Sequence, residues 1–469
     1  MYEPIRSHTC RNQLGQILRQ RGLDPETFCA RTGIDLALCR DDRRLPDITA
    51  MEALGRALPD LDPTSLVVFD PEEAPPALQV TLWGCGNLGH VLAGLLSARP
   101  DLRVHVRVST ADKVQRLQQG MEAQGGIAVR RREGTVVGRP HLVTTDPAQA
   151  VSGSQLILLC VPALVHAEAL QQLLPHVAPG AWVGAVPAPG GFDWKVRWLL
   201  GARAQQVGIF GVGVIPWMCK VRAYGQEVEV LGRKILNGVV ALPGARTGKI
   251  ADLLAGLLGM PFLDLRTFLN IALIPGNPFL HPAIMWDLFS DWDGRPLAEA
   301  PLFYEGLSQR AADLLQALSG ELLALRAALE AQLPGLRLSA VLPLDLSIRL
   351  GYGADVADPS SLRTIIATNR AYAGLRAPMV KVEGGWAPDW NSRFFWEDVP
   401  HGLVMLRGLA DLAGVPTPAL DRLLVWAQER MGREYLRDGR LEGRDLASAS
   451  VPAQYGITGL AGLGGADPC

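Results

Sequence analysis

The chain has 469 residues, of which 48% are hydrophobic, and this length predicts two or three domains with a large core. Lys plus Arg number 45 and Asp plus Glu 47, so the net charge of −2 argues against a basic nucleic-acid or acidic-membrane binder. No apolar run reaches the roughly 18 residues of a membrane helix, and the first residues lack the apolar core of a signal peptide. The seven cysteines show no CxxC spacing, so we expect reduced thiols in a cytoplasmic protein, with neither disulfides nor a metal site.

Residues 1–75 are predicted to form short helices, with breaks at Gly22 and Gly33 and a further helix over 48–58. Their order loosely resembles a repressor-type helix-turn-helix, which raises the hypothesis of a cofactor-sensing regulator built on an enzyme scaffold. The segment holds nine Arg and no Lys against thirteen Asp plus Glu, whereas DNA binding requires a basic face. We therefore expect a packing or oligomerisation module without a nucleic-acid partner, followed by a Pro- and Glu-rich linker over 69–79.

Residues 76–268 alternate between apolar strands and amphipathic helices. Strands are expected over 79–84, 102–109, 154–162 and 181–187, with helices over 88–98 and 166–177 and a helical and loop-like stretch after 109. Strands that are apolar throughout and alternate with helices indicate a parallel sheet covered on both faces. The sequence therefore predicts an α/β domain of the Rossmann type in this part of the chain.

Residues 269–469 are predicted to form an all-α domain, because strand patterns fade beyond about residue 270. A long helix is expected over 310–333, where strong helix formers recur with helical periodicity. Near the end, Thr417 can cap a helix whose first residue is Pro418. One face of that helix is apolar and consists of Leu420, Leu423, Leu424 and Met431.

The sequence "GCGNLG" places a GxGxxG pattern directly after the first α/β strand and at the start of a helix. In this context the pattern is a dinucleotide-binding fingerprint. Gly84 permits the tight turn, Gly86 lets the backbone approach a pyrophosphate, and Gly89 lets helix and strand pack closely. Asn87 and Leu88 complete the turn, and the helix N-terminus offers N–H groups to the phosphates. The alternative is a tight turn that binds nothing.

The strand over 102–109 should end near the adenosine ribose of a bound dinucleotide. NAD-selective sites place an Asp or Glu there, which accepts a hydrogen bond from the ribose 2′-hydroxyl. This strand ends instead with Arg107, Ser109 and Thr110, a cation and two hydroxyls that suit a 2′-phosphate. We therefore favour NADP(H) as the cofactor and keep NAD(H) as the alternative, since Arg107 can also point to solvent.

A second loop, residues 160–163, leaves its strand at the carboxyl end, where ligands bind in open α/β sheets. Val161 and Pro162 are therefore expected to run past the cofactor. His166 either makes a polar contact with a ligand or caps the following helix.

The helical part contains two polar stretches. His281 lies between two prolines in "GNPFLHP"; an imidazole suits proton transfer near neutral pH, although a lone His is more often structural. Residues 391–404, "NSRFFWEDVPHGLV", place Arg393 and the adjacent carboxylates Glu397 and Asp398 among aromatic residues. Arg can bind a carboxylate with two parallel hydrogen bonds, and Asp can orient an imidazole. The alternative is a buried structural ion pair.

From about residue 78 to its end, the chain resembles the octopine/nopaline (opine) dehydrogenase family. The motifs that carry this resemblance are "GCGNLGHVLAG", "CVPALVHAEAL" with "PGGFDW", "GNPFLHP", "FYEGLS", "RFFWEDVPHGLV" and "GVPTPALDRLLVWAQERMGREYL". The later motifs are specific to that family and are not general Rossmann features. The usual family chain begins near the glycine-rich strand, so residues 1–75 are a departure from it.

The resemblance implies a reaction and a set of site residues. An amino acid condenses with a 2-oxo acid, such as pyruvate, to give an imine, which NAD(P)H reduces to a secondary amine. His281 is implied as the catalytic acid/base and Asp398 as its partner. Arg393 is implied as the clamp for a substrate carboxylate, and Asn277 as a residue that shapes the surroundings of the histidine. Neither the particular amino acid nor the oligomeric state can be read from the sequence.

A carbonyl reductase that acts on a 2-oxo acid without an amine is the alternative enzyme. Two-domain reductases of that class depend on a catalytic lysine, whereas Lys381 is the only lysine of this chain after Lys249. Dependence on an amine distinguishes the two reactions.

Overall fold

The computed structural model describes residues 10–62, 65–69, 78–234 and 236–463. The described chain forms two compact units, an α/β unit of residues up to Ala188 with Phe192–Ile271, and a helical unit of Pro189–Gly191 with residues from Ala272 on. Most of the expected linker over 69–79 lies outside the described residues. The division into domains 1–75, 76–268 and 269–469 stays a prediction.

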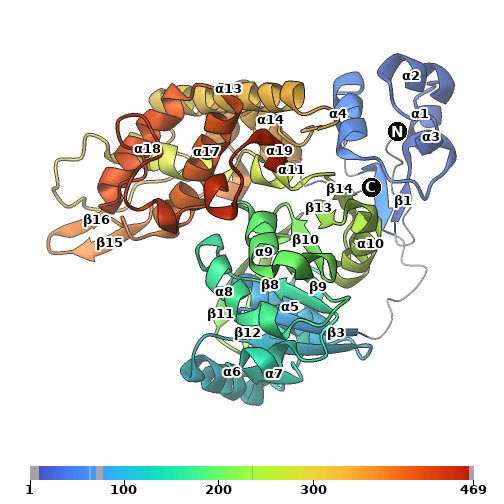
Figure 1. Ribbon diagram of the computed structural model, residues 1–469, viewed down its shortest axis with the longest axis horizontal. Coiled ribbons are helices and arrows are strands. Elements are labelled where there is room, and N and C mark those ends of the chain that lie inside the picture. Colours follow the sequence, from blue (N-terminus) through green and yellow to red (C-terminus); the bar gives the residue numbers. More distant parts are fainter. Residues whose placement is uncertain (1–9, 63–64, 70–77, 235, 464–469) are drawn as a thin grey trace. The chain divides into compact units, whose positions relative to one another are not determined.

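An eight-stranded sheet forms the centre of the α/β unit (Figure 1). Its order is β14 (Phe262–Asp264), β13 (Asn237–Leu242), β10 (Gly208–Val212), β9 (Trp182–Ala185), β8 (Leu156–Leu159), β3 (Leu78–Trp83), β4 (Leu102–Arg107) and β7 (Leu142–Thr144). Neighbouring strands are parallel except β10 and β13. The four strands expected from the sequence are therefore confirmed as β3, β4, β8 and β9, and their continuous apolar character reflects burial on both faces.

The helices between these strands are α5 (Asn87–Ser97), α6 (Ala111–Gln124), α7 (Pro147–Val151), α8 (His166–Leu173), α9 (Phe192–Leu200) and α10 (Thr247–Leu258), and α11 (Phe268–Ala272) follows the last strand. The succession β3, α5, β4 with parallel strands is the βαβ unit that carries the glycine fingerprint in a Rossmann fold. The fold class predicted from the sequence, a Rossmann-type unit followed by a helical one, is confirmed.

A second sheet in the α/β unit was not predicted. It has the order β11 (Trp217–Ala223), β12 (Glu227–Arg233), β5 (Ile127–Arg131) and β6 (Gly134–Gly138). Strands β5 and β6 form an antiparallel hairpin with much exposed surface, so they lack the continuous apolar run that marks the central strands. Helix α5 contacts this sheet closely at Gly94, where a Cβ atom would lie 2.8 Å from the carbonyl oxygen of Ile127.

The N-terminal helices are α1 (Leu14–Gln20), α2 (Pro25–Thr32), α3 (Ala37–Arg40) and α4 (Ile48–Ala57). Gly22 and Gly33 have φ of 69° and 73°, so both predicted helix breaks are left-handed turns. Two unpredicted strands, β1 (Cys10–Asn12) and β2 (Val67–Phe69), pair antiparallel beside these helices. Helix α3 has only four residues, too short for the recognition helix of a helix-turn-helix.

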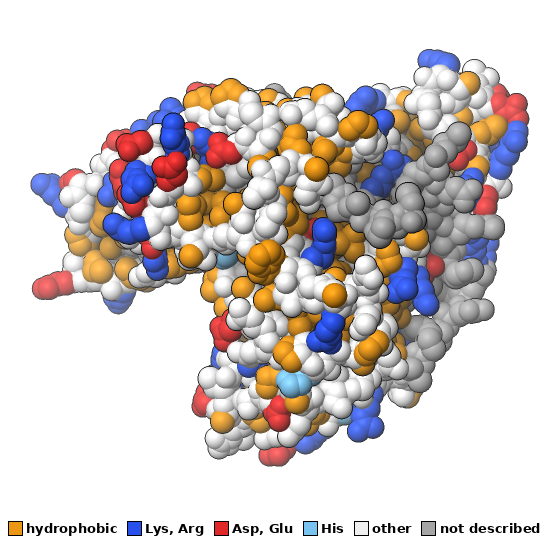
Figure 2. Space-filling view, viewed as in Figure 1, with side chains coloured by type: hydrophobic (Ala, Val, Ile, Leu, Met, Phe, Trp, Pro, Cys, Tyr) orange, Lys and Arg blue, Asp and Glu red, His pale blue; other side chains and the backbone are white. Residues whose placement is uncertain are grey.

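The helical unit is built on α12 (Asn277–Phe289), α13 (Gln309–Gln332), α14 (Leu344–Tyr352), α15 (Leu362–Ala367), α16 (Arg393–Trp396), α17 (Val404–Ala413) and α18 (Pro418–Met431). The expected long helix is confirmed as α13, and the expected apolar face of α18 is buried. A short hairpin of β15 (Met379–Val382) and β16 (Gly385–Pro388) was not predicted; it lies at the edge of this unit in Figure 1. Figure 2 shows basic and acidic side chains interspersed over the helices at its upper left.

Within the part of the chain that the structure describes, no helix combines the length and the apolarity needed to cross a membrane.

Candidate active site

The glycine-rich turn joins β3 to α5 and has the geometry of a phosphate-binding turn. Gly84 has a φ of 106°, and a Cβ atom there would collide with the side chain of Val161. A Cβ atom on Gly89 would collide with the carbonyl oxygen of Gly84. Gly86 is exposed at the N-cap of α5 and has open space where its Cβ would be, and the first turn of α5 holds no acidic residue. The turn therefore fits a pyrophosphate at the helix N-terminus.

The other residues of this turn differ in surroundings. Leu88 is buried in the core of the unit, so it supports the turn from within. Asn87 is exposed, and its side-chain oxygen accepts a hydrogen bond from Val221 N at 2.9 Å. That bond ties the start of α5 to strand β11 of the second sheet.

The carboxyl end of β4 carries cations and hydroxyls in an arrangement that the sequence only partly anticipated. The Arg107 guanidinium lies 4.5 Å from the ring centre of Trp83 and donates to Gln172 Oε1 at 2.6 Å. It does not point freely to solvent. Ser109 and Thr110 are both exposed, and Lys113 Nζ donates to Ser109 Oγ at 2.8 Å.

Thr110 also acts as the N-cap of α6, where its hydroxyl accepts from Lys113 N at 3.3 Å. Lys113 therefore brings a cation into contact with Ser109, and it was not among the residues predicted from the sequence. Its position on the first turn of α6 could have been found from the TADK sequence that follows the strand.

The loop of residues 160–163 is held against the glycine-rich turn by His166. This imidazole is fully buried at the start of α8, and its Nε2 lies 3.1 Å from the carbonyl oxygen of Val161. Burial lowers the pKa of His166 to about 3, so the ring is neutral and Nε2–H can donate. Val161 in turn packs against Gly84, whereas Pro162 is exposed. Of the two roles considered for His166, capping of the following helix is wrong, because the side chain is hydrogen-bonded to the loop before it.

His281 and Asp398 meet in the helical unit. His281 lies in α12, a helix that begins at Asn277 with Pro278 in its first turn, where a missing N–H costs no helical bond. Its Nδ1 lies 2.7 Å from Asp398 Oδ2, and its Nε2 lies 3.0 Å from the hydroxyl oxygen of Tyr304. His281, Asp398 and Tyr304 are 4%, 6% and 7% exposed, so these hydrogen bonds are shielded from water. The structure thus brings together the two residues implied as the acid/base pair.

Aromatic rings fix the plane of the His281 imidazole. The Phe394 ring stacks on it at 3.6 Å between centres with an angle of 17°, and Phe303 lies at 5.9 Å. Tyr304 stacks in the same way on Tyr372, at 4.1 Å and 17°. Packing on both rings leaves little freedom to turn, so the hydrogen-bonded geometry is preorganised.

Asp398 is positioned by an unusual helix start. It directly precedes a π-helical segment, η8 (Val399–Leu403), which continues into α17. Such segments are rare and occur often at functional sites. Gly402 in η8 packs against Pro278, since a Cβ atom on Gly402 would lie 2.7 Å from Pro278 Cγ. This close approach of η8 and α12 sets the distance between Asp398 and His281.

Arg393 and Asn277 are both exposed at the edge of this cluster. Arg393 begins α16, one turn before Glu397, and its Nε lies 3.6 Å from Glu397 Oε2. The pair is half-exposed on the arginine side and long, so it holds the guanidinium only weakly. Asn277 lies one helical turn before His281 on α12. Among the described residues, neither side chain is hydrogen-bonded to the His281–Asp398 pair.

Tyr304 and Phe394 are the site residues that sequence reasoning missed. Burial is the main cause that raises the pKa of Tyr304, with the charges of Tyr352 and Asp398 adding to it and that of Arg393 opposing it. Both residues stand inside motifs already singled out, FYEGLS and RFFWED. Their place in these motifs was the signal that could have pointed to them. The sequence alone does not tell which aromatic residue of each motif faces His281.

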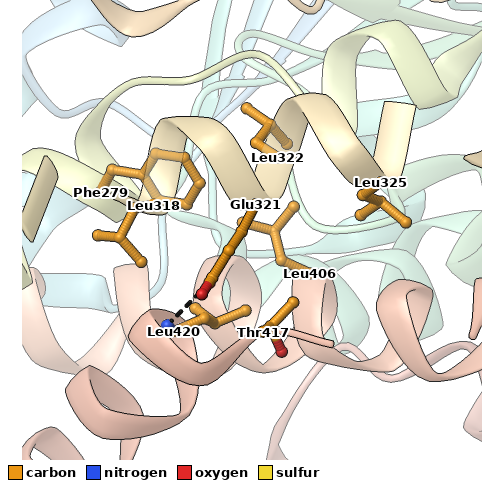
Figure 3. Close-up of a pocket in the computed structure, with 8 residues that line it drawn as sticks. All are labelled: Phe279, Leu318, Glu321, Leu322, Leu325, Leu406, Thr417 and Leu420. Carbon is orange, nitrogen blue, oxygen red and sulfur yellow. Dashed lines mark hydrogen bonds between the residues drawn. The ribbon is translucent and has the colours of Figure 1, made fainter. Parts of the chain in front are cut away.

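A small, mostly apolar pocket elsewhere in the helical unit is not this site (Figure 3). It lies between α12, α13, α17 and α18 and is lined by Phe279, Leu318, Glu321, Leu322, Leu325, Leu406, Thr417 and Leu420. Its one carboxylate, Glu321, accepts from Ala419 N at 2.6 Å and Leu420 N at 3.0 Å, so it caps α18. Thr417 occupies the predicted N-cap position, but its hydroxyl makes no capping bond. The cap therefore comes from another helix.

The two units together define a class of protein. A dinucleotide turn in an α/β unit supplies the means to bind NAD(P), and a shielded His–Asp pair in the helical unit supplies an acid/base group. This combination is that of an NAD(P)-dependent dehydrogenase.

Comparison with known proteins identifies the family. Residues 264–431 match the model of the NAD/NADP octopine/nopaline dehydrogenase α-helical domain, and residues 80–186 match that of ketopantoate reductase PanE/ApbA. The chain is 37% identical to tauropine dehydrogenase of Arabella iricolor, over 81% of this chain and 98% of that one. It is 36% identical to octopine dehydrogenase of Pecten maximus, over 82% of this chain and 98% of that one.

A solved structure of octopine dehydrogenase with NADH and L-arginine superposes with a TM-score of 0.77 at 36% identity, covering 84% of this chain and 99% of that one. The chain therefore belongs to the octopine/nopaline dehydrogenase family. It is an NAD(P)-dependent oxidoreductase of the opine dehydrogenase type, which acts on CH–NH bonds.

Proposed function

We propose that His281 is the acid/base of this reaction and that Asp398 is its partner. The observation that carries the proposal is the 2.7 Å contact between Nδ1 and the buried carboxylate. Asp398 accepts a hydrogen bond from Nδ1–H, which fixes the tautomer and leaves Nε2 to exchange protons. In the oxidative direction His281 receives the proton lost by the secondary amine or by the attacking water. In the reductive direction it returns that proton.

We propose that Arg393 holds a substrate carboxylate. Its guanidinium is half-exposed, and within the described part of the chain its ion pair is a long one to Glu397, so a substrate can engage it with two parallel hydrogen bonds. Such a clamp acts by positioning the imine carbon for reduction. Asn277, exposed at the start of α12, is proposed to shape the surroundings of His281 one turn away.

The cofactor is proposed to be NADP(H) rather than NAD(H). When bound, its nicotinamide supplies or accepts the hydride. Ser109, Thr110 and Lys113 offer two hydroxyls and a cation at the carboxyl end of β4, where a 2′-phosphate would lie, and Ser109 and Lys113 are already hydrogen-bonded. Arg107 is engaged with Trp83 and Gln172, so we assign the main phosphate contact to Lys113. Val161 and Pro162 are proposed to line the cofactor from the loop beside the glycine-rich turn.

The substrates are proposed to be an amino acid and a 2-oxo acid such as pyruvate. Octopine dehydrogenase has been solved with NADH and L-arginine and with NADH and pyruvate, which supports these two classes of small molecule. No nucleic-acid partner is proposed, since arginines of the N-terminal helices pair with carboxylates, as Arg21 does with Asp60 at 2.8 Å. A cytoplasmic location is proposed, because the cysteines lack the paired spacing of a disulfide framework.

The test follows oxidation of NADPH and of NADH with pyruvate and a pool of amino acids, for the wild type, His281→Ala and His176→Ala. His176 is exposed on the α/β unit and serves as the matched control. We expect turnover only when amine and oxo acid are both present, its loss in His281→Ala, and its retention in His176→Ala. Activity that survives in His281→Ala would contradict the assigned role.

A carbonyl reductase remains the second candidate, because residues 80–186 also match the ketopantoate reductase model. Turnover with an oxo acid alone would favour it. The chain supplies little for that mechanism, since Lys381 is its only lysine after Lys249. Lys381 lies on the exposed β15 strand, outside the His281 cluster.

A further inference from the structure

The Tyr304 hydroxyl is hydrogen-bonded to Nε2 of His281, the ring nitrogen that exchanges protons in the proposed function. Nδ1 is bonded to Asp398, so the neutral ring carries its proton there and Nε2 has a lone pair. The Tyr304 hydroxyl, 3.0 Å away, is then the donor and Nε2 the acceptor. Both polar atoms of the imidazole are therefore engaged within the protein.

The remaining surface of the imidazole is closed. Phe394 covers one face at 3.6 Å, Phe303 lies at 5.9 Å, and only 4% of His281 is exposed. A substrate proton can reach Nε2 only through the Tyr304 oxygen or by displacing the tyrosine. Displacement is opposed because the Tyr304 ring is buried, stacked on Tyr372 at 4.1 Å and packed edge-on against Phe303 at 4.8 Å.

The chemistry of the phenol suits transmission of a proton. Burial is the largest of the effects that raise the pKa of Tyr304, so the hydroxyl keeps its proton across the neutral range. A hydroxyl is both donor and acceptor, and it can give one proton while it takes another. Its oxygen can therefore face a substrate while its hydrogen faces His281.

We propose that Tyr304 is a catalytic residue and the outer member of a proton relay, Asp398–His281–Tyr304. In the oxidative direction the Tyr304 oxygen takes the proton from the substrate nitrogen or the attacking water, while its own proton passes to His281 Nε2. The imidazolium that forms is stabilised by Asp398, and Tyr304 is neutral before and after. The reductive direction runs in reverse. The relay rests on the proposed role of His281 in the opine reaction.

The test is Tyr304→Phe, which keeps the ring and its stacking on Tyr372 but removes the hydroxyl. We expect kcat to fall by about tenfold to a hundredfold in both directions, with the KM for the reduced cofactor unchanged. The solvent isotope effect measured in mixtures of H2O and D2O should show two transferred protons in the wild type and one in the variant. A kcat within twofold of the wild type, or higher than it, would overturn the relay.

The matched control is Tyr372→Phe, the same change in the stacked neighbour, and it should leave kcat within about twofold. An equal loss in both variants would assign the effect to aromatic packing and overturn the relay. The 15N resonance of His281 Nε2, measured in histidine-labelled protein, should move in Tyr304→Phe and not in Tyr372→Phe. An unmoved resonance would overturn the relay alone, whereas a wild type without amine-dependent turnover would overturn the proposed function.

Discussion

At the scale of single residues, the site depends on two short contacts whose loss has separate consequences. In the proposed function, Asp398 fixes which nitrogen of His281 exchanges protons; the second contact is that of Lys113, which places a charge beside Ser109 at the end of β4. We assign the first contact to the chemical step and the second to the choice of cofactor. Each can be removed by one substitution that keeps the shape of its surroundings.

For Asp398→Asn we expect kcat to fall by about 10²–10⁴ with little change in cofactor affinity, because the amide can no longer hold the Nδ1–H tautomer as a carboxylate does. Steady-state kinetics in both directions measures the change. The control is Asp291→Asn, which removes an exposed carboxylate paired with Arg310 at 2.8 Å. A kcat for Asp398→Asn within threefold of the wild type would show that the pair is structural.

For Lys113→Ala we expect weaker binding of NADPH and unchanged binding of NADH. A charge-assisted contact to a phosphate is worth about 1.5–3 kcal/mol, which corresponds to roughly tenfold to a hundredfold in Kd. Titration by nicotinamide fluorescence measures both constants, with Lys249→Ala on α10 as the control. Equal losses for the two cofactors, or a wild type that prefers NADH, would contradict the assignment of the 2′-phosphate site.

At the scale of elements, the active site depends on how closely η8 approaches α12. Gly402 makes this approach possible, since any side chain there would meet the rigid ring of Pro278. The π-helical turn of η8 comes directly after Asp398, so movement of η8 moves the carboxylate. The glycine is therefore a positioning residue for the His281–Asp398 pair.

For Gly402→Ala we expect a lower kcat and a free energy of unfolding reduced by about 1–3 kcal/mol, because the added methyl group overpacks a close contact. The matched control is Gly320→Ala. Gly320 is exposed within α13 with open space around it, and alanine there should stabilise the helix by about 0.5–1 kcal/mol. Denaturant unfolding measures the free energy of unfolding of the two variants, and steady-state kinetics measures their kcat. Equal effects of the two substitutions would rule out the proposed steric role.

At the scale of the whole molecule, buried carboxylates make stability depend on pH. Asp264, on β14, accepts from Arg266 N at 2.6 Å through Oδ1, and its buried Oδ2 has no partner among the described residues. Burial raises the pKa of Asp264 from 3.8 to about 6. The folded state therefore binds this proton more tightly than the unfolded state, so stability falls as pH rises from about 4 to about 6 and stays at the lower value above that.

For Asp264→Asn we expect a protein more stable than the wild type at pH 8 by up to about 3 kcal/mol, with the difference shrinking as pH falls from 6 to 4. Urea unfolding at pH 5 and pH 8 measures this. Asp445→Asn should instead be less stable than the wild type at both pH values. The hydrogen bond from Arg433 lowers the pKa of Asp445 from 3.8, so the ionised carboxylate stabilises the fold at pH 5 and pH 8 alike. A difference for Asp264→Asn that does not change with pH would contradict the argument.

The sequence by itself determined the features that lie within short windows of the chain. Apolar periodicity predicted β3, β4, β8 and β9 and the long helix α13, and the glycine spacing predicted the turn before α5. These follow from local sterics and from alternation of buried and exposed positions, which neighbouring residues encode directly. The hairpin strands β5 and β6 escaped prediction because exposed residues interrupt their apolar pattern, and because β12, the other partner of β5, lies far along the chain.

The tertiary structure alone decided which distant residues meet. His281 and Asp398 are 117 positions apart, and their pairing was expected only from the resemblance to a family. Tyr304 reaches the other nitrogen of His281 from a separate loop, and Glu321 caps α18 in place of Thr417. Such contacts depend on how helices pack, and packing is a property of the whole apolar surface rather than of any short stretch of sequence.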